Sequence, residues 1–138
     1  MTGFTRISDA PIEVHSRINN PNVVAVLDSS LLKIVNVTDG LKEGGTLLIN
    51  SDRSGKELTK ELGISNVHCY TVDATKISLD VFGSGKAFNT AMLGALLKAV
   101  PVVSTESLTN AMKERFSAEL IDKNLQVFEK GMTEVKVD

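Results

Sequence analysis

The sequence predicts an α/β fold, a three-layer sandwich in which helices flank a mainly parallel or mixed central sheet. Strand-length apolar runs at residues 23–27, 46–50 and 67–72 alternate with segments of helical pattern. Strands that alternate with helices are joined by crossovers, which make neighbouring strands parallel. Because 138 residues with 42% hydrophobic content can build one sizeable core, residues 1–138 are expected to form a single domain.

Turn-forming residues organise the first third of the chain. The cluster at residues 8–11 lies between two isoleucines and predicts a hairpin, or an edge strand and turn. The run at 23–27 is apolar throughout, which suits a strand covered on both faces. A helix is then expected, capped by Asp28 or Ser29 and ended by Asp39-Gly40. Its apolar face comprises Leu31, Leu32 and Val35.

The middle third repeats the strand and helix pattern. After the strand at 46–50, a helix is expected at 54–62, with Gly63 closing it. Residues 76–81 alternate like a strand, yet their opposite charges are spaced as on a helix. So short a run leaves both conformations open.

A helix predicted at residues 88–100 is apolar nearly all round, so we expect it to be buried or to lie under a partner. Small residues at a spacing of three and four share one of its faces: Ala91, Gly94 and Ala95. They permit a close approach of another element, and internal packing is favoured over a subunit contact.

Two amphipathic helices are expected at residues 106–116 and 118–130, the second ended by Gly131. Asn124 falls on the apolar face of the second helix, where a buried amide needs hydrogen-bond partners. Structural bracing is therefore the favoured interpretation of Asn124. The remaining residues, 134–138, are expected to form a short extension.

Charge and hydropathy exclude several functions. Fifteen basic and seventeen acidic residues are interspersed and give a net charge of -2, and aromatic residues make up only 4% of the chain. Neither a positive field nor stacking platforms for nucleic acid are therefore expected. Residues 1–17 contain charges where a secretory signal would be apolar, which favours a cytoplasmic protein. The apolar run at 91–97 is far shorter than the roughly 20 residues of a membrane span.

The thiol and imidazole groups offer little chemistry. Cys69 is the only cysteine, so the chain can form neither an internal disulfide nor an iron-sulfur cluster with four thiolate ligands. Its position in a strand-like run favours a buried small residue over a nucleophile. His15 and His68 lack neighbours with metal-ligand spacing, and a structural or solvated role is favoured for both.

Residues 83–86, Gly-Ser-Gly-Lys, precede a helix and could bring backbone amides close to an anion. A P-loop needs Ser or Thr after its lysine and four residues between its glycines, whereas Ala87 follows here. A plain loop is therefore favoured. No strand leads into a three-glycine dinucleotide fingerprint either, which disfavours autonomous NAD binding.

Several segments together resemble the gamma subunits of the pyruvate and related 2-oxoacid:ferredoxin oxidoreductases. The segments are Phe4 to Asp9 with Pro11-Ile12, Leu41 to Gly45 with Leu48 to Ser51, Asn89 to Ala95, Val103-Ser104 with Leu108, Lys113 to Phe116, and Asn124 with Phe128 to Gly131. The resemblance covers nearly all of this chain. Gamma subunits usually begin with a glycine-rich strand, loop and helix that has no counterpart here, so the chain is expected to correspond to the carboxy-terminal portion of a gamma-type domain.

The resemblance implies an accessory role in a complex that oxidatively decarboxylates a 2-oxoacid to acyl-CoA and reduces ferredoxin. Thiamine diphosphate, Mg and iron-sulfur clusters are expected on partner subunits, because this chain holds neither the thiamine-binding Gly-Asp-Gly motif nor the cysteines. The resemblance also implies an edge of a coenzyme A site. Our candidates for it are Asn50, Ser51, Asn89 and Thr90. Turn and cap hydrogen bonds are the simpler explanation of the same four residues.

Two other interpretations remain open at this stage. A stand-alone α/β module that binds a nucleotide or coenzyme A would be a monomer and would bind its ligand unaided. A subunit would instead present a poorly protected hydrophobic face to its partner chains. A relative of the indolepyruvate type would change the 2-oxoacid used and hardly change the fold.

Overall fold

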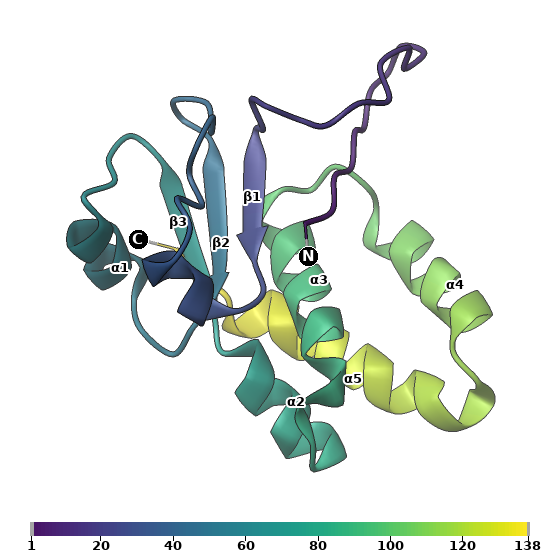
Figure 1. Ribbon diagram of the computed structural model, residues 1–138. Helices are drawn as coiled ribbons and strands as arrows, with labels where there is room; N and C mark the ends of the chain where they lie inside the picture. Colours follow the sequence, from purple (N-terminus) through teal and green to yellow (C-terminus); the bar gives the residue numbers. More distant parts are fainter. Residues whose placement is uncertain (1, 138) are drawn as a thin grey trace.

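A four-stranded sheet forms the centre of the computed structural model, which describes residues 2–137 (Figure 1). The strands lie in the order β1-β2-β3-β4; the first three are parallel, and β4 is antiparallel to β3. The bounds of the strands are β1 Val23–Val26, β2 Thr46–Asn50, β3 His68–Val72 and β4 Lys136–Val137. The three predicted strands and the mixed sheet are thus confirmed. The predicted short extension supplies the edge strand β4, although Asp138 lies outside the described residues.

Helices account for most of the remaining regular structure. Their bounds are η1 Ser29–Lys33, α1 Gly55–Leu62, α2 Ala74–Phe82, η2 Gly85–Ala87, α3 Phe88–Ala99, α4 Thr105–Arg115 and α5 Ala118–Glu134, where η marks a 3-10 helix. Helix α1 matches its prediction because both ends carry local signals: the Ser54 side chain accepts from the Glu57 backbone, and Gly63 adopts the left-handed conformation. Residues 76–81, left open by their periodicity, belong to α2.

The sheet has a core on each face, which confirms the three-layer architecture. Leu47, Ile49 and Cys69 pack on one side with residues of η1 and α1. Leu48 and Val72 point the other way, into a cluster with α2, α3 and α5. Alternate residues of a strand face opposite sides, so an apolar run such as that of β2 needs both layers. Cys69 is buried, as predicted.

The prediction that Gly131 ends the last helix is wrong, because α5 continues to Glu134. Gly131 lies inside the helix at its crossing with α3, where an added Cβ would overlap the Ala91 carbonyl. Gly94 makes the reciprocal approach to the Phe128 carbonyl. Tertiary contact, rather than a helix terminus, thus explains the glycine. The predicted internal packing of the small-residue face is confirmed.

The first core strand is less covered than its composition predicts. β1 is an edge strand that pairs only with β2 among the described strands, while α3 packs over β2 and β3. As a result Leu27, just past the strand, is 45% exposed, and Ala25 is exposed too. The expectation that both faces of this strand are covered is therefore wrong for the face on the α3 side.

The helix expected from residue 28 to 39 is also wrong in extent, since only η1 is helical there. Leu32 packs into the core beside α1, but Ile34 is 77% exposed and Val35 is 52% exposed. The segment holds several β-branched residues, which are poor helix formers, and only partly buried side chains, Leu32 and Val37, anchor it to the core. A single short turn is therefore all that forms.

Residues 2–22 contain no strand or helix and form a hairpin-shaped excursion from the body (Figure 1). The Arg6 guanidinium donates to the carbonyl oxygens of Ser16 and Arg17, at 2.5 and 3.2 Å, and joins the two arms. The predicted turn is present as a bend at Asp9 and Ala10, but neither a β-hairpin nor an edge strand forms there. Across the described residues, no helix has both the length and the apolar character needed to cross a membrane.

Candidate functional site

The carboxyl ends of β1, β2 and β3 meet at one edge of the sheet and border a cleft of about 430 Å³. In open α/β sheets, this is the edge at which ligands bind. The cleft is lined by Leu27, Asp28, Ser29, Asn50, Ser51, Asp52, Asp73, Thr75, Gly85 and Phe88. These residues come from the strand ends, the loops that follow them, the first turn of α2, η2 and the start of α3.

Asn50, the last residue of β2, forms the centre of this edge. Its Nδ2 donates to the Leu27 carbonyl at 3.1 Å and to Thr75 Oγ1 at 3.0 Å. Its Oδ1 accepts from the Ala74 backbone N–H at 3.0 Å. One amide therefore connects the end of β1 with the first turn of α2, across the end of β2, and both of its N–H donors are engaged.

Ser51 continues the same edge. Its backbone N–H donates to the Val72 carbonyl at 3.0 Å, and its Oγ accepts from the Arg53 backbone at 3.1 Å. The latter bond leaves the hydroxyl proton available to a ligand. Ser51 thus combines a turn role with a donor that faces the cleft.

The cleft carries negative charge. Asp28, Asp52 and Asp73 contribute carboxylates, and no lysine or arginine lines it. A hydrogen bond from the Ser30 backbone lowers the pKa of Asp28, and Asp73 accepts from the Lys76 backbone at the start of α2. Carboxylates repel phosphate, and their remaining lone pairs can accept from N–H and O–H donors. The lining therefore suits a neutral, donor-bearing ligand better than an anion.

Two basic residues close to the cleft in sequence are engaged elsewhere. Arg53 follows Asp52, but its guanidinium bonds to Glu61 at 2.6 Å and to Glu57 at 3.5 Å on α1. Lys86 follows Gly85, but its ammonium lies 5.4 Å from the centre of the Phe82 ring. The loop at 83–86 thus contributes a glycine to the cleft wall rather than its cation.

Only two of the four predicted site residues line the cleft. Asn50 and Ser51 do, whereas Asn89 is exposed on the first turn of α3 and its Oδ1 accepts from the Thr90 backbone at 3.0 Å. Thr90 is 6% exposed and donates to Asn124 Oδ1 at 3.1 Å. Asn124 Nδ2 in turn donates to the Leu120 carbonyl at 3.0 Å, which confirms its bracing role.

Sequence reasoning missed most of the cleft lining, although part of it carried a signal. Asp28 and Asp73 directly follow the β1 and β3 regions, and parallel strands bring their carboxyl ends together. That rule alone would have added both carboxylates. Phe88 and Gly85 carry no such signal, because only the return of α3 across the sheet brings them to this edge.

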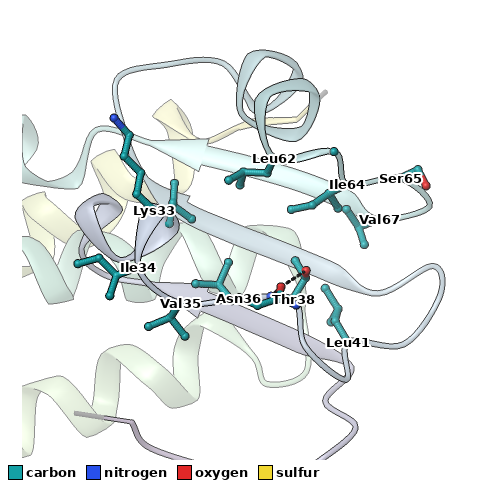
Figure 2. A pocket seen from close by; sticks show the side chains of 13 residues that line it. Lys33, Ile34, Val35, Asn36, Thr38, Leu41, Leu62, Ile64, Ser65 and Val67 are labelled. Carbon is teal, nitrogen blue, oxygen red and sulfur yellow. Dashed lines mark hydrogen bonds between the residues drawn. The ribbon is translucent and has the colours of Figure 1, made fainter.

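A second hollow, of about 590 Å³, lies between the segment after η1 and the end of α1 (Figure 2). Aliphatic side chains, including Leu41, Leu62 and Ile64, project toward it, and Lys33 is the one charged residue in its lining. It contains no acid and base pair for catalysis. Among residues 2–137, no group of three or more histidine, cysteine or acidic side chains is arranged to hold a metal ion.

The chain is therefore a three-layer α/β domain whose open sheet carries an acidic cleft at the carboxyl ends of its parallel strands. The family of pyruvate ferredoxin/flavodoxin oxidoreductases matches residues 1–134, and the chain belongs to that family.

Individual proteins of related sequence and a solved structure also resemble the chain. The chain is 42% identical over 137 residues to the pyruvate/ketoisovalerate oxidoreductases common subunit gamma of Thermococcus kodakarensis, covering 99% of this chain and 74% of that one. It is 38% identical to the pyruvate synthase subunit PorC of Methanocaldococcus jannaschii, covering 96% and 70%. The crystal structure of the pyruvate oxidoreductase subunit PORC of Thermotoga maritima superposes with a TM-score of 0.80 at 34% identity, covering 88% and 67%. The chain thus spans about two-thirds to three-quarters of these relatives, whose names mark them as subunits.

Proposed function

We propose that this chain is an accessory gamma-type subunit of a complex that oxidatively decarboxylates a 2-oxoacid, pyruvate or a relative, to acyl-CoA with reduction of ferredoxin. The observation that carries the proposal is the 42% identity over 137 residues to a gamma subunit. The cleft adds support, because its lining offers binding groups and no activated nucleophile or histidine base.

In this proposal the chain is non-catalytic, and partner subunits hold the thiamine diphosphate, Mg and iron-sulfur clusters. The single thiol argues for that division, since Cys69 of β3 is buried in the core between the sheet and α1. An iron-sulfur cluster typically takes four thiolate ligands. Electrons would therefore pass to ferredoxin through other chains of the complex, which we expect to be cytoplasmic.

We further propose that the carboxyl-edge cleft receives coenzyme A through its neutral pantetheine arm. Coenzyme A joins that amide-bearing chain to three phosphate groups. Amide N–H groups suit Asp52 and Asp73, amide carbonyls suit Ser51, and methylene groups suit Leu27 and Phe88. The carboxylates would repel the phosphates, so basic groups on other parts of the assembly are expected to hold those.

The subunit assignment is tested by purifying the chain from native extract with a small tag and identifying its partners by mass spectrometry. Co-purification of thiamine-binding and iron-sulfur subunits, with coenzyme A-dependent reduction of viologen by a 2-oxoacid, is the expected result. Parallel assays with pyruvate, 2-ketoisovalerate and indolepyruvate identify the substrate. A monomer that binds coenzyme A unaided would instead establish the stand-alone binding module.

The ligand assignment is tested on the purified complex by hydrogen–deuterium exchange. We expect pantetheine to slow amide exchange at residues 27–31 and 50–53, and adenosine 3′,5′-bisphosphate to leave those residues unchanged. Residues 32–38, in the second hollow, serve as the internal control. Protection by the bisphosphate alone would contradict the proposed use of the neutral arm.

A further inference from the structure

The three hydrogen bonds of the Asn50 side chain reach the two sides of the cleft, the chain after β1 and the start of α2. The β1–β2 ladder ends at the pair Val26 and Ile49, so the chain leaves the sheet at Leu27. The Leu27 carbonyl is there held by the Asn50 side chain at 3.1 Å, one position beyond the ladder. Because β1 is an edge strand, this bond fixes the direction in which residues 27–30 leave the sheet.

The same amide organises the opposite wall. Asn50 Oδ1 accepts from the Ala74 N–H, and Asp73 accepts from the Lys76 N–H, so two of the otherwise unpaired N–H groups at the start of α2 are satisfied from the cleft edge. Asn50 Nδ2 also bonds Thr75 Oγ1, which orients that hydroxyl. One wall of the cleft, at Leu27, is therefore joined to the other wall, at Thr75, by the Asn50 side chain.

We infer that Asn50 is a positioning residue, which sets the spacing between the Leu27 and Thr75 walls and acts on the ligand through them. This inference rests on the proposed binding of coenzyme A in the cleft. Both N–H donors of Asn50 are engaged at 3.0 to 3.1 Å, so a direct bond to a ligand would cost one of the wall contacts. The recognition groups are instead the side chains around it, such as Ser51 and Thr75.

The test compares three variants in the assembled complex. Asn50→Ala removes all three bonds, whereas Asn50→Asp keeps the acceptor for Ala74 and removes both donors. Asn36→Ala is the matched control, because Asn36 is an asparagine whose side chain is likewise hydrogen-bonded, here to Thr38, but it lies in an exposed loop that lines the second hollow. Each complex is measured for amide exchange and for the kinetics of 2-oxoacid oxidation with coenzyme A as the varied substrate.

We expect Asn50→Ala to speed exchange at residues 27–31 and 74–76, and to raise the KM for coenzyme A about tenfold while kcat changes less than about twofold. Asn50→Asp should speed exchange at 27–31 while the Ala74 amide remains protected. Asn36→Ala should leave the exchange at both walls unchanged. If the Asn50→Ala variant does not assemble into the complex, exchange and KM are measured on Asn50→Asp instead, and the same two outcomes test the inference.

Three results would overturn the inference, and they are distinguishable. A raised KM without faster exchange would make Asn50 a direct ligand contact, and faster exchange with an unchanged KM would make it a purely structural residue. In both cases the proposed function stands if coenzyme A protects the wild-type cleft. Absence of that protection in the wild-type complex would overturn the proposed ligand site together with the inference.

Discussion

Gly131 of α5 lies against the main chain of Ala91 in α3, so closely that a single added carbon would overlap the Ala91 carbonyl oxygen. Gly94 of α3 approaches the Phe128 carbonyl in the same way. The two glycines therefore allow α3 and α5 to cross almost backbone to backbone. This crossing joins the core beneath the sheet to the cluster that anchors α4, in which Met112 packs with Phe128.

Gly131→Ala is expected to lower the free energy of unfolding by about 1–3 kcal/mol, because the new methyl overpacks a backbone contact. The loss should appear even though alanine favours a helix by about 1 kcal/mol over glycine. Urea denaturation measures it. Gly85→Ala is the matched control, since its Cβ would lie 3.8 Å from Thr75 in ordinary contact. Equal stability of the two variants would contradict the close crossing.

Thr90→Val should destabilise the protein by about 1–3 kcal/mol, because it removes the donor to the buried Asn124 Oδ1. The double variant Thr90→Val with Asn124→Leu should recover part of that loss, since no buried polar atom is then left unpaired. Thr109→Val provides the control, because Thr109 bonds to carbonyls of its own helix near the surface. Thermal and urea unfolding of the wild type, Thr90→Val, Asn124→Leu and the double variant would reveal the coupling, and strict additivity of the two single changes would argue against it.

Ser78→Ala is expected to loosen the loop that brings Gly85 to the cleft. The Ser78 hydroxyl is fully buried, donates to the Ser84 carbonyl at 2.6 Å and accepts from the Ala87 N–H at 2.9 Å. Its loss should cost about 1–3 kcal/mol and speed amide exchange at residues 84–87. Ser65→Ala, at an exposed position, is the comparison. Unchanged exchange at Ala87 would show that the loop is held by other contacts.

The carboxyl of Asp28 should titrate below its ordinary pKa of 3.8, because the folded chain donates the Ser30 N–H to the carboxylate. A pKa lowered by folding adds stability above the unfolded value, and that contribution is lost as the pH falls through the folded value. NMR titration of the side-chain carboxyl carbon measures the folded pKa directly. Asp28→Asn keeps a capping oxygen and should remove this pH dependence. Titration at or above 3.8 would mean that the cap is not formed in solution.

Local signals sufficed for much of the architecture. The run Thr46–Asn50, the Ser54 cap and Gly63 each specify a conformation through neighbouring residues, and the structure confirms all three. The resemblance to gamma subunits likewise rested on linear segments, and the family match over residues 1–134 confirms it. For the cleft, the resemblance to gamma subunits supplied Asn50 and Ser51, which line it, together with Asn89 and Thr90, which do not.

Long-range packing decided what local signals could not. Residues 28–39 have a helical pattern, but only Ser29–Lys33 is helical because the segment has little core to pack against. Gly131 has the sequence signal of a helix end, but it lies inside α5 because its main chain contacts Ala91 of α3. Thr90 resembles an accessible helix-start residue until its bond to Asn124, 34 positions away, is known. The sequence by itself thus determined the strands, the capped helix and the family. The tertiary structure alone decided which polar groups face the cleft and which brace the core, because that depends on contacts between residues far apart in the chain.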